Sequence, residues 1–186
     1  MQQQSAIARR LSAAFTEFGT KDYETTLLHL FPALDSTAKK RRPKSGVGDR
    51  IRKFLEDDED LLSFIALGLC VTNIEAGGKT IPQAIYEYGR CSIEHEGELD
   101  KRLTITEEQQ MLLGGQWVLP VGYIFGMMML VLVAPENKDE KFTSDFGIIV
   151  RGVQFNANES WGQILTCREK IGLNAMKQRI SSSRHS

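Results

Sequence analysis

The stretch Met111–Ala134, MLLGGQWVLPVGYIFGMMMLVLVA, decides the fold because its 24 residues carry no charge. A hydropathy window would mark it as a membrane span. Pro120 lies inside it, however, and proline is favoured in the first turn of a helix and disfavoured in the interior. We therefore expect a helix over 121–134, about 21 Å long at about 1.5 Å per residue. A bilayer core is roughly 30 Å thick, so the sequence predicts a buried central helix and no membrane association.

Amphipathic helices are expected before this segment, where apolar residues recur every three or four positions. Gly19 ends the first helix, and Pro32 is expected to bend or break the second. The capping-box pattern Thr80–Gln83 starts the fourth helix and Gly97 stops it. The expected helices cover 5–18, the segment from Asp22 past Pro32, 47–69 with its acids 56–60 either outward or in a break, and 80–96.

Shorter β-elements are expected around and after the central helix. The alternation in 102–107 and the run 116–119 after a Gly-Gly turn predict a small β-hairpin, and 146–155 is expected to hold a short strand. Asn158 is expected to cap a last helix that runs through Met176. The predicted fold class is mainly α: a helical bundle of four to six helices with a small β-hairpin insertion. We expect one domain over 1–180 and a disordered tail over 181–186.

Charge and cysteine content exclude several classes of protein. Lys and Arg together number 23 and Asp and Glu number 24, which gives a net charge of −1. Any binding of nucleic acid must therefore depend on a local basic patch. Three cysteines without C-x-x-C spacing argue against a disulfide framework and a structural zinc site. Together with the absence of a signal-like start, they favour a cytoplasmic setting. We expect no metal and no cofactor.

The densest basic run lies between residues 39 and 53, with eight basic residues and one acid. It is interrupted by Pro43 and two glycines, and we expect an exposed basic loop leading into the next helix. Such a loop suits contact with an RNA backbone, and the residues predicted to make it are Lys39, Lys40, Arg41, Arg42 and Lys44. The alternative is a solvated loop paired with the acids at 56–60.

Arg90 and His95 form the candidate catalytic pair. A five-residue step on an α-helix turns the side chain by 140° beyond one full turn, so the pair shares a face only if the helix unwinds before His95. Gly97 makes that unwinding expected. Histidine transfers protons near neutral pH, and arginine binds phosphate through two hydrogen bonds, which suits metal-independent cleavage of RNA. The alternative is a surface ion pair between Arg90 and Glu94.

Residues 81–99, with the phrase Arg90-Cys91-x-x-x-His95-Glu96-Gly97 at a helix end, resemble the HEPN superfamily. The resemblance implies a HEPN-like bundle that forms a homodimer, with one Arg90–His95 set from each subunit in a shared cleft. Many members are metal-independent endoribonucleases that act as toxins or phage-defence effectors, which implies RNA as substrate and an antitoxin as partner. Other members are noncatalytic modules that bind nucleotides, RNA or partner proteins. In active members the residue after the arginine is commonly polar, whereas here it is Cys91.

Overall fold

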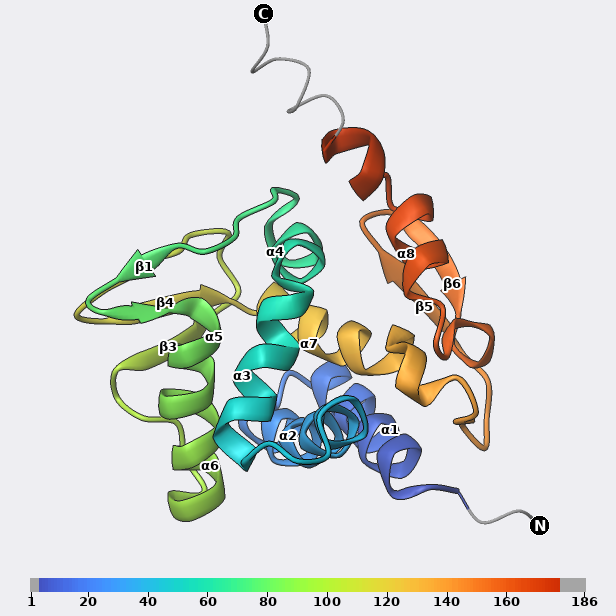
Figure 1. Cartoon of the computed structure of the whole chain (residues 1–186), viewed down its shortest axis with the longest axis horizontal. Coiled ribbons are helices and arrows are strands. Elements are labelled where there is room, and N and C mark those ends of the chain that lie inside the picture. The colour runs from blue at the N-terminus through green and yellow to red at the C-terminus, as the bar shows by residue number, and fades with distance from the viewer. Residues whose placement is uncertain (1–3, 178–186) are drawn as a thin grey trace, which may run out of the picture.

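The computed structural model describes residues 4–177, and their fold is mainly helical (Figure 1). The α-helices are α1 (Ala6–Gly19), α2 (Tyr23–Arg41), α3 (Val47–Asp57), α4 (Glu59–Leu67), α5 (Ile81–Ala84), α6 (Cys91–Glu96), α7 (Gly122–Val133) and α8 (Ile164–Lys170). The π-helix η1 (Ile85–Arg90) joins α5 to α6, and η2 (Pro135–Asn137) and η3 (Asn158–Ser160) are short 3-10 helices. The strands are β1 (Glu75–Ala76), β2 (Lys79–Thr80), β3 (Leu103–Thr106), β4 (Trp117–Pro120), β5 (Gly147–Val150) and β6 (Val153–Asn156).

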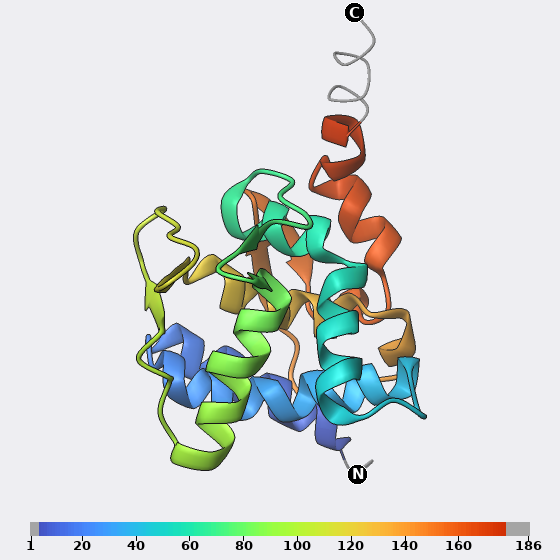
Figure 2. The same ribbon diagram turned by 60° about the vertical axis from the view of Figure 1, so that its left-hand side comes forward.

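Helix α7 is the buried central helix that the sequence predicts. Almost all of its side chains are buried, and it packs against α1, α2, α4 and α8 (Figures 1 and 2). Pro120 ends β4 just before the helix, and Pro135 follows it. The helix is 12 residues long. Within residues 4–177, no helix has both the length and the hydropathy that crossing a bilayer requires.

Side-chain caps mark the starts of the first two helices. Ser5 accepts a hydrogen bond from the backbone N of Ala8 at 3.1 Å, and Asp22 accepts one from Thr25 at 3.0 Å. Of the bend or break expected at Pro32, the break is wrong, because α2 continues through the proline to Arg41. Buried neighbours on both sides of the proline pack against α1, and this burial outweighs the one backbone hydrogen bond that proline removes.

The expected third helix is divided at Asp58 into α3 and α4, which was one of the two alternatives for its acidic segment. The break places Asp58 and Asp60 beside Arg168 of α8, whose guanidinium nitrogens lie 2.8 Å and 2.7 Å from their carboxylate oxygens. Asp58 also lies 3.1 Å from Arg41 at the end of α2. These half-buried ion pairs hold the C-terminal helix to the remainder of the fold.

The predicted β-hairpin is wrong in its topology, because β3 and β4 pair in parallel, with Leu103 opposite Trp117. The Gly-Gly turn does reverse the chain, but the residue it brings back to β4 is Leu112. Leu112 and Val118 exchange backbone hydrogen bonds of 3.0 Å and 2.9 Å in an antiparallel bridge. The connection after β3 therefore lets β4 pair on one side with β3 and on the other with Leu112.

The C-terminal part also differs from expectation. In place of one short strand over 146–155, two antiparallel strands, β5 and β6, occupy 147–156 and turn at Arg151 and Gly152 with φ of 49° and 81°. Asn158 begins η3 instead of capping the last helix, and α8 starts only at Ile164. The side chain of Asn158 instead accepts a hydrogen bond from the backbone of Phe142. The predicted tail 181–186 and the last residues of the predicted domain lie outside the described residues.

Candidate functional site

The candidate catalytic residues lie on one continuous helical segment, α5–η1–α6. Thr80 and Gln83 form the predicted capping box, with hydrogen bonds of 2.9 Å and 3.4 Å. Gly97 ends the segment in the left-handed conformation with φ of 77°. Between these ends, η1 is a π-helical turn, a departure that occurs frequently at functional sites and that the sequence pattern did not predict.

The expected unwinding before His95 is wrong, because α6 stays helical through Glu96. On an unbroken helix the side chains of Arg90 and His95 point in directions that differ by about 140°. The His95 side chain is exposed. The Arg90 side chain is 18% exposed, and its Nη2 lies 3.5 Å from Oε2 of Glu94. The alternative interpretation, an Arg90–Glu94 pair within the helix, is therefore present in the structure.

The charge of Arg90 acts on Tyr86, and we call the group that includes them the Arg90 cluster: Arg52, Tyr86, Arg90 and Cys91. The guanidinium carbon of Arg52 lies 5.2 Å from the centroid of the Tyr86 ring. Burial and a hydrogen bond with Cys91 raise the pKa of Tyr86, and the positive charges of Arg90 and Arg52 act in the opposite direction. Two guanidinium groups from α3 and η1 thus act on the same phenol.

Gly48, at the start of α3, makes room for this cluster. A Cβ atom at position 48 would lie 2.8 Å from the hydroxyl oxygen of Tyr86 and 3.0 Å from Nη1 of Arg52. Any other residue here would displace one of these two side chains. No local motif connects α3 with η1, so the sequence does not predict a site made by Arg52, Tyr86 and Gly48.

Arg52 differs from its neighbour Arg50 in its electrostatic partners. Arg50 makes two hydrogen bonds of 2.7 Å to the carboxylate of Asp35. Among the residues the structure describes, no carboxylate lies within ion-pair distance of Arg52. Arg52 therefore keeps its hydrogen-bonding capacity for an anion, with Arg90 as a second cation beside Tyr86.

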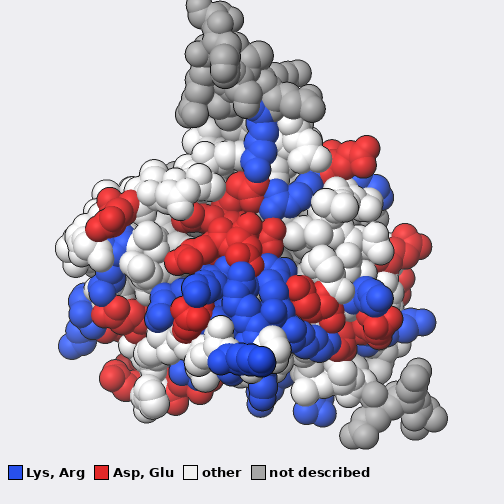
Figure 3. Space-filling view, viewed as in Figure 1, with Lys and Arg blue, Asp and Glu red and all other residues white. Residues whose placement is uncertain are grey.

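The basic run is not the exposed loop that the sequence predicts. Lys39, Lys40 and Arg41 form the last turn of α2. Arg41 pairs with Glu136, Asp57 and Asp58, and Arg42 pairs with Asp57 at 2.7 Å. Figure 3 shows basic side chains gathered below an acidic area on this face. The expected alternative, pairing with the acids that follow, is correct for Arg41 and Arg42.

Two members of the predicted RNA-binding set are more available. The Lys39 and Lys44 side chains are exposed and have no carboxylate partner among residues 4–177. Lys40 is also exposed, but its ammonium group lies 2.8 Å from Oε1 of Glu140 and 3.1 Å from Oδ1 of Asn137. Only part of the predicted basic surface is thus free to meet a phosphate backbone.

Comparison with known proteins places the chain in a family. The family model described as Rv1289 matches residues 6–184. The chain belongs to the Rv1289 family. Protein Rv1289 of Mycobacterium tuberculosis and protein Mb1320 of Mycobacterium bovis are each 24% identical to it over 175 residues, which cover 84% of this chain and 83% of each relative. No solved structure matches it.

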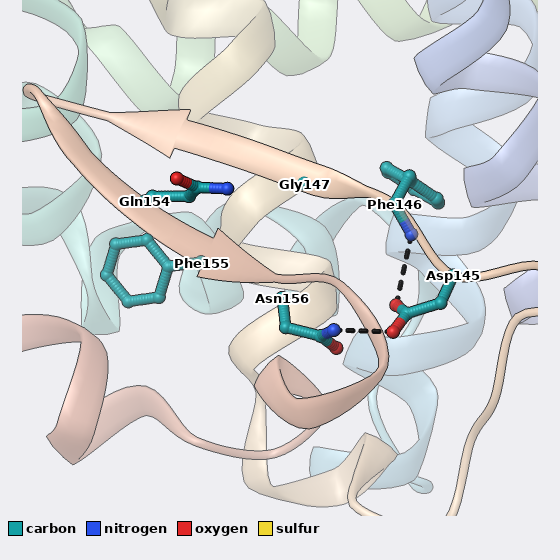
Figure 4. Close-up of a pocket in the computed structure, with 6 residues that line it drawn as sticks. All are labelled: Asp145, Phe146, Gly147, Gln154, Phe155 and Asn156. Atoms are coloured by element: carbon teal, nitrogen blue, oxygen red, sulfur yellow. Dashed lines mark hydrogen bonds between the residues drawn. The ribbon is translucent and has the colours of Figure 1, made fainter.

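The hairpin β5–β6 of this Rv1289-family chain borders an open pocket of about 580 Å³ (Figure 4). Its one charged lining residue, Asp145, accepts hydrogen bonds from the side chain of Asn156 and from the backbone N of Phe146 at 3.0 Å. These hydrogen bonds lower the pKa of Asp145. Since neighbouring groups already use the hydrogen-bonding capacity of this carboxylate, Asp145 has a structural role in holding the hairpin, and the pocket offers no free charged group.

Metal-ligating side chains are not gathered into a metal site in the described residues of the Rv1289-family chain. Over the described part of the chain, no group of three or more His, Cys, Asp or Glu side chains is placed to hold a metal ion. The cysteines Cys70 and Cys91 are half-buried and Cys167 is buried. Burial raises the pKa of Cys167 to about 11, which disfavours its reactive thiolate at neutral pH. The Arg90 cluster therefore remains the candidate site with chemistry still available.

Proposed function

We propose that this chain is an RNA-binding module that holds a phosphate group between Arg52 and Arg90. The observation that carries the proposal is the Arg52 guanidinium over the Tyr86 ring, without a carboxylate partner in the described residues. The positive charge of Arg90 acts on the same phenol. Guanidinium groups bind phosphate oxygens through paired hydrogen bonds. Proteins that bind single-stranded RNA commonly combine such groups with aromatic side chains.

Charge around the cluster supports the same function. The whole chain has a net charge of −1, so binding must depend on a local surface. Lys39 and Lys44 precede α3, the helix that supplies Arg52, and both are exposed. They are the part of the predicted basic set that would add salt-dependent contacts to the RNA backbone. The three free cysteines are in keeping with a reducing cytoplasm as the place where the module works.

The experiment is fluorescence anisotropy with a labelled single-stranded RNA at low salt in the presence of EDTA. Arg52→Ala and Arg90→Ala are each expected to weaken binding by about tenfold, which corresponds to loss of a charge-assisted contact of about 1.4 kcal/mol. Arg9→Ala is the matched control, because Arg9 is an exposed arginine on α1 outside the cluster. Equal weakening by all three variants would contradict a specific site.

Metal-independent RNA cleavage by a HEPN-like homodimer is the second candidate function. It is favoured by the exposed position of His95 in the last turn of α6. Because Arg90 and His95 diverge within one chain, a second copy would have to bring its imidazole to the phosphate that Arg90 holds. As a toxin or phage-defence effector, such a dimer would work with an antitoxin that masks this surface.

Degradation of the same RNA in EDTA tests the second function separately. Wild-type protein is expected to cleave, and His95→Ala is expected to abolish cleavage while RNA binding and the melting temperature stay close to wild type. If the wild-type protein binds the RNA without cleaving it, the ribonuclease proposal is contradicted and the RNA-binding proposal stands. Undiminished cleavage by His95→Ala would contradict the catalytic role proposed for His95.

A further inference from the structure

A second pocket, of about 400 Å³, opens beside the junction of α3 and α4 and shares no residue with the Arg90 cluster. Its lining combines four acidic side chains, two basic ones and two polar residues of the following loop. These residues are Glu56, Asp57, Glu59, Asp60, Arg168, Lys177, Thr72 and Asn73. It lies in the part of the molecule where acidic side chains gather in Figure 3.

Two of the four carboxylates already have cationic partners. Asp60 lies 2.7 Å from Arg168 and also pairs with Lys177, and Asp57 pairs with Arg41 and Arg42. Over residues 4–177, neither Glu56 nor Glu59 has a lysine or arginine within ion-pair distance. The pocket therefore carries an excess of negative charge that the described protein groups do not neutralise.

Glu59 is the residue that points to a ligand. Only 4% of its surface is exposed. Its Oε2 accepts a hydrogen bond of 2.8 Å from the backbone N of Asn73, but its Oε1 is buried and has no hydrogen-bond partner among residues 4–177. A buried carboxylate oxygen without a donor is costly, because it has lost water and gained nothing in exchange. The vacant acceptor at the pocket is thus suited to a group that brings both positive charge and N–H donors.

We propose that this pocket binds a primary ammonium group, which donates a hydrogen bond to Oε1 of Glu59 and is balanced by Glu56. An ammonium ion fits better than a divalent metal, because no described set of three or more ligating side chains surrounds the site. It also fits better than an anion, because Arg168 already donates to Asp58 and Asp60. The inference does not depend on the proposed RNA binding.

The test is an NMR titration of the full chain with n-butylammonium chloride at constant ionic strength. Saturable shifts of the Asn73 amide are expected. Tetramethylammonium, which has the charge but no N–H donor, is expected to give none. Absence of saturation with butylammonium, or equal saturation with both cations, overturns the proposal. Saturation with Mg²⁺ but not with butylammonium would identify a metal site instead.

Variants locate the binding. Glu59→Gln keeps an oxygen for Asn73 but removes the charge, and it is expected to weaken butylammonium binding by about tenfold or more. Glu75→Gln, an exposed glutamate outside the pocket, is expected to bind as wild type does. If Glu59→Gln does not fold, Glu56→Gln is expected to weaken binding severalfold. Wild-type affinity in a folded Glu59→Gln, or failing that in Glu56→Gln, overturns the assignment.

A final arm separates two sources of the ammonium group. A free amine and a lysine side chain of a partner protein present the same chemistry to Glu59. Nα-acetyl-lysine amide is expected to bind at least as tightly as butylammonium if the natural ligand is a protein lysine. Markedly weaker binding of the lysine derivative assigns the pocket to a small free amine, and both results keep the ammonium site.

Discussion

Nη2 of Arg90 lies 3.5 Å from Oε2 of Glu94, one helical turn further along the same helix. The guanidinium that we propose as a phosphate ligand is thus in contact with a carboxylate before any ligand arrives. A pair of this spacing on a helix surface is worth only a few tenths of a kcal/mol, so a phosphate can displace it at little cost. Glu94 therefore competes with the ligand without blocking the site.

Removing this competitor is expected to strengthen RNA binding. Glu94→Gln frees Arg90, and we expect about a two- to threefold lower Kd at low salt, measured by anisotropy, with a change in unfolding free energy below about 0.5 kcal/mol. Glu96→Gln is the control, because it removes the same charge from the same helix without touching the pair. If both variants tighten binding alike, overall charge and not the release of Arg90 is responsible.

A methyl group at position 48 is expected to disturb the Arg90 cluster. Gly48→Ala brings Cβ to 2.8 Å from the hydroxyl of Tyr86, so the ring or Arg52 must move. Because both contacts are with side-chain ends, we expect severalfold weaker RNA binding but a stability change below about 1 kcal/mol by urea unfolding. Gly46→Ala meets nothing within 4 Å and serves as control. Unchanged RNA affinity in Gly48→Ala would show that the cluster is not the binding site.

The ion pairs between α4 and α8 predict an acid-dependent loss of stability. Burial alone would raise the pKa of Asp60, but hydrogen bonds from Arg168 and Lys177 outweigh it and bring the pKa to about 2 from 3.8. A pKa that is lower in the folded state contributes stability above the unfolded value, and this contribution disappears as the pH falls from about 4 to 2. We expect it to amount to about 2 kcal/mol at neutral pH.

Asp60→Asn provides the measurement. The difference in unfolding free energy between wild type and Asp60→Asn, obtained from urea titrations at several pH values, is expected to be largest near pH 7 and to shrink below pH 4. A difference that stays constant down to pH 2 would mean that Asp60 is not ionised in contact with Arg168.

Close contact between the buried helix and α4 predicts a large effect at Gly122. A Cβ there would lie 2.7 Å from the carbonyl oxygen of Ala66 and 2.8 Å from its Cα, and backbone atoms cannot move aside as a side chain can. We expect Gly122→Ala to lower the unfolding free energy by about 2 to 3 kcal/mol. Gly115→Ala, which meets nothing within 4 Å, is expected to be close to neutral. Equal stability of the two variants would contradict this packing.

The fold agrees with the prediction from the sequence where neighbouring residues specify the structure. The capping box at Thr80, the left-handed Gly97 and the proline-bounded helix α7 all depend on interactions within a few positions. The fold differs from the prediction where packing between distant residues determines the structure. Pro32 remains inside α2 because that helix is buried against α1, and β4 pairs in parallel with β3 because Leu112 takes the hairpin position.

The candidate site was likewise predicted only in its local contacts. The spacing of four residues predicts the Arg90–Glu94 pair, which is the alternative to a catalytic role for Arg90. Arg52 and Tyr86 are 34 positions apart. Their contact depends on how α3 packs against η1, and the spacing of apolar residues does not predict that packing. Arg168 is more than 100 residues from Asp58 and Asp60 in the sequence, and the sequence likewise does not predict their pairing.

The π-helical turn at 85–90 makes the length of this segment matter as much as its composition. A π-helical turn holds about one residue more than the same stretch of α-helix, and it absorbs that residue locally. Deleting one residue there would return the turn to ordinary α-helical winding while Cys91 and Glu94 keep their neighbours. Among homologous sequences, a single gap at this point would therefore be compatible with the rest of the fold and would change only how Tyr86 and Arg90 are presented to α3.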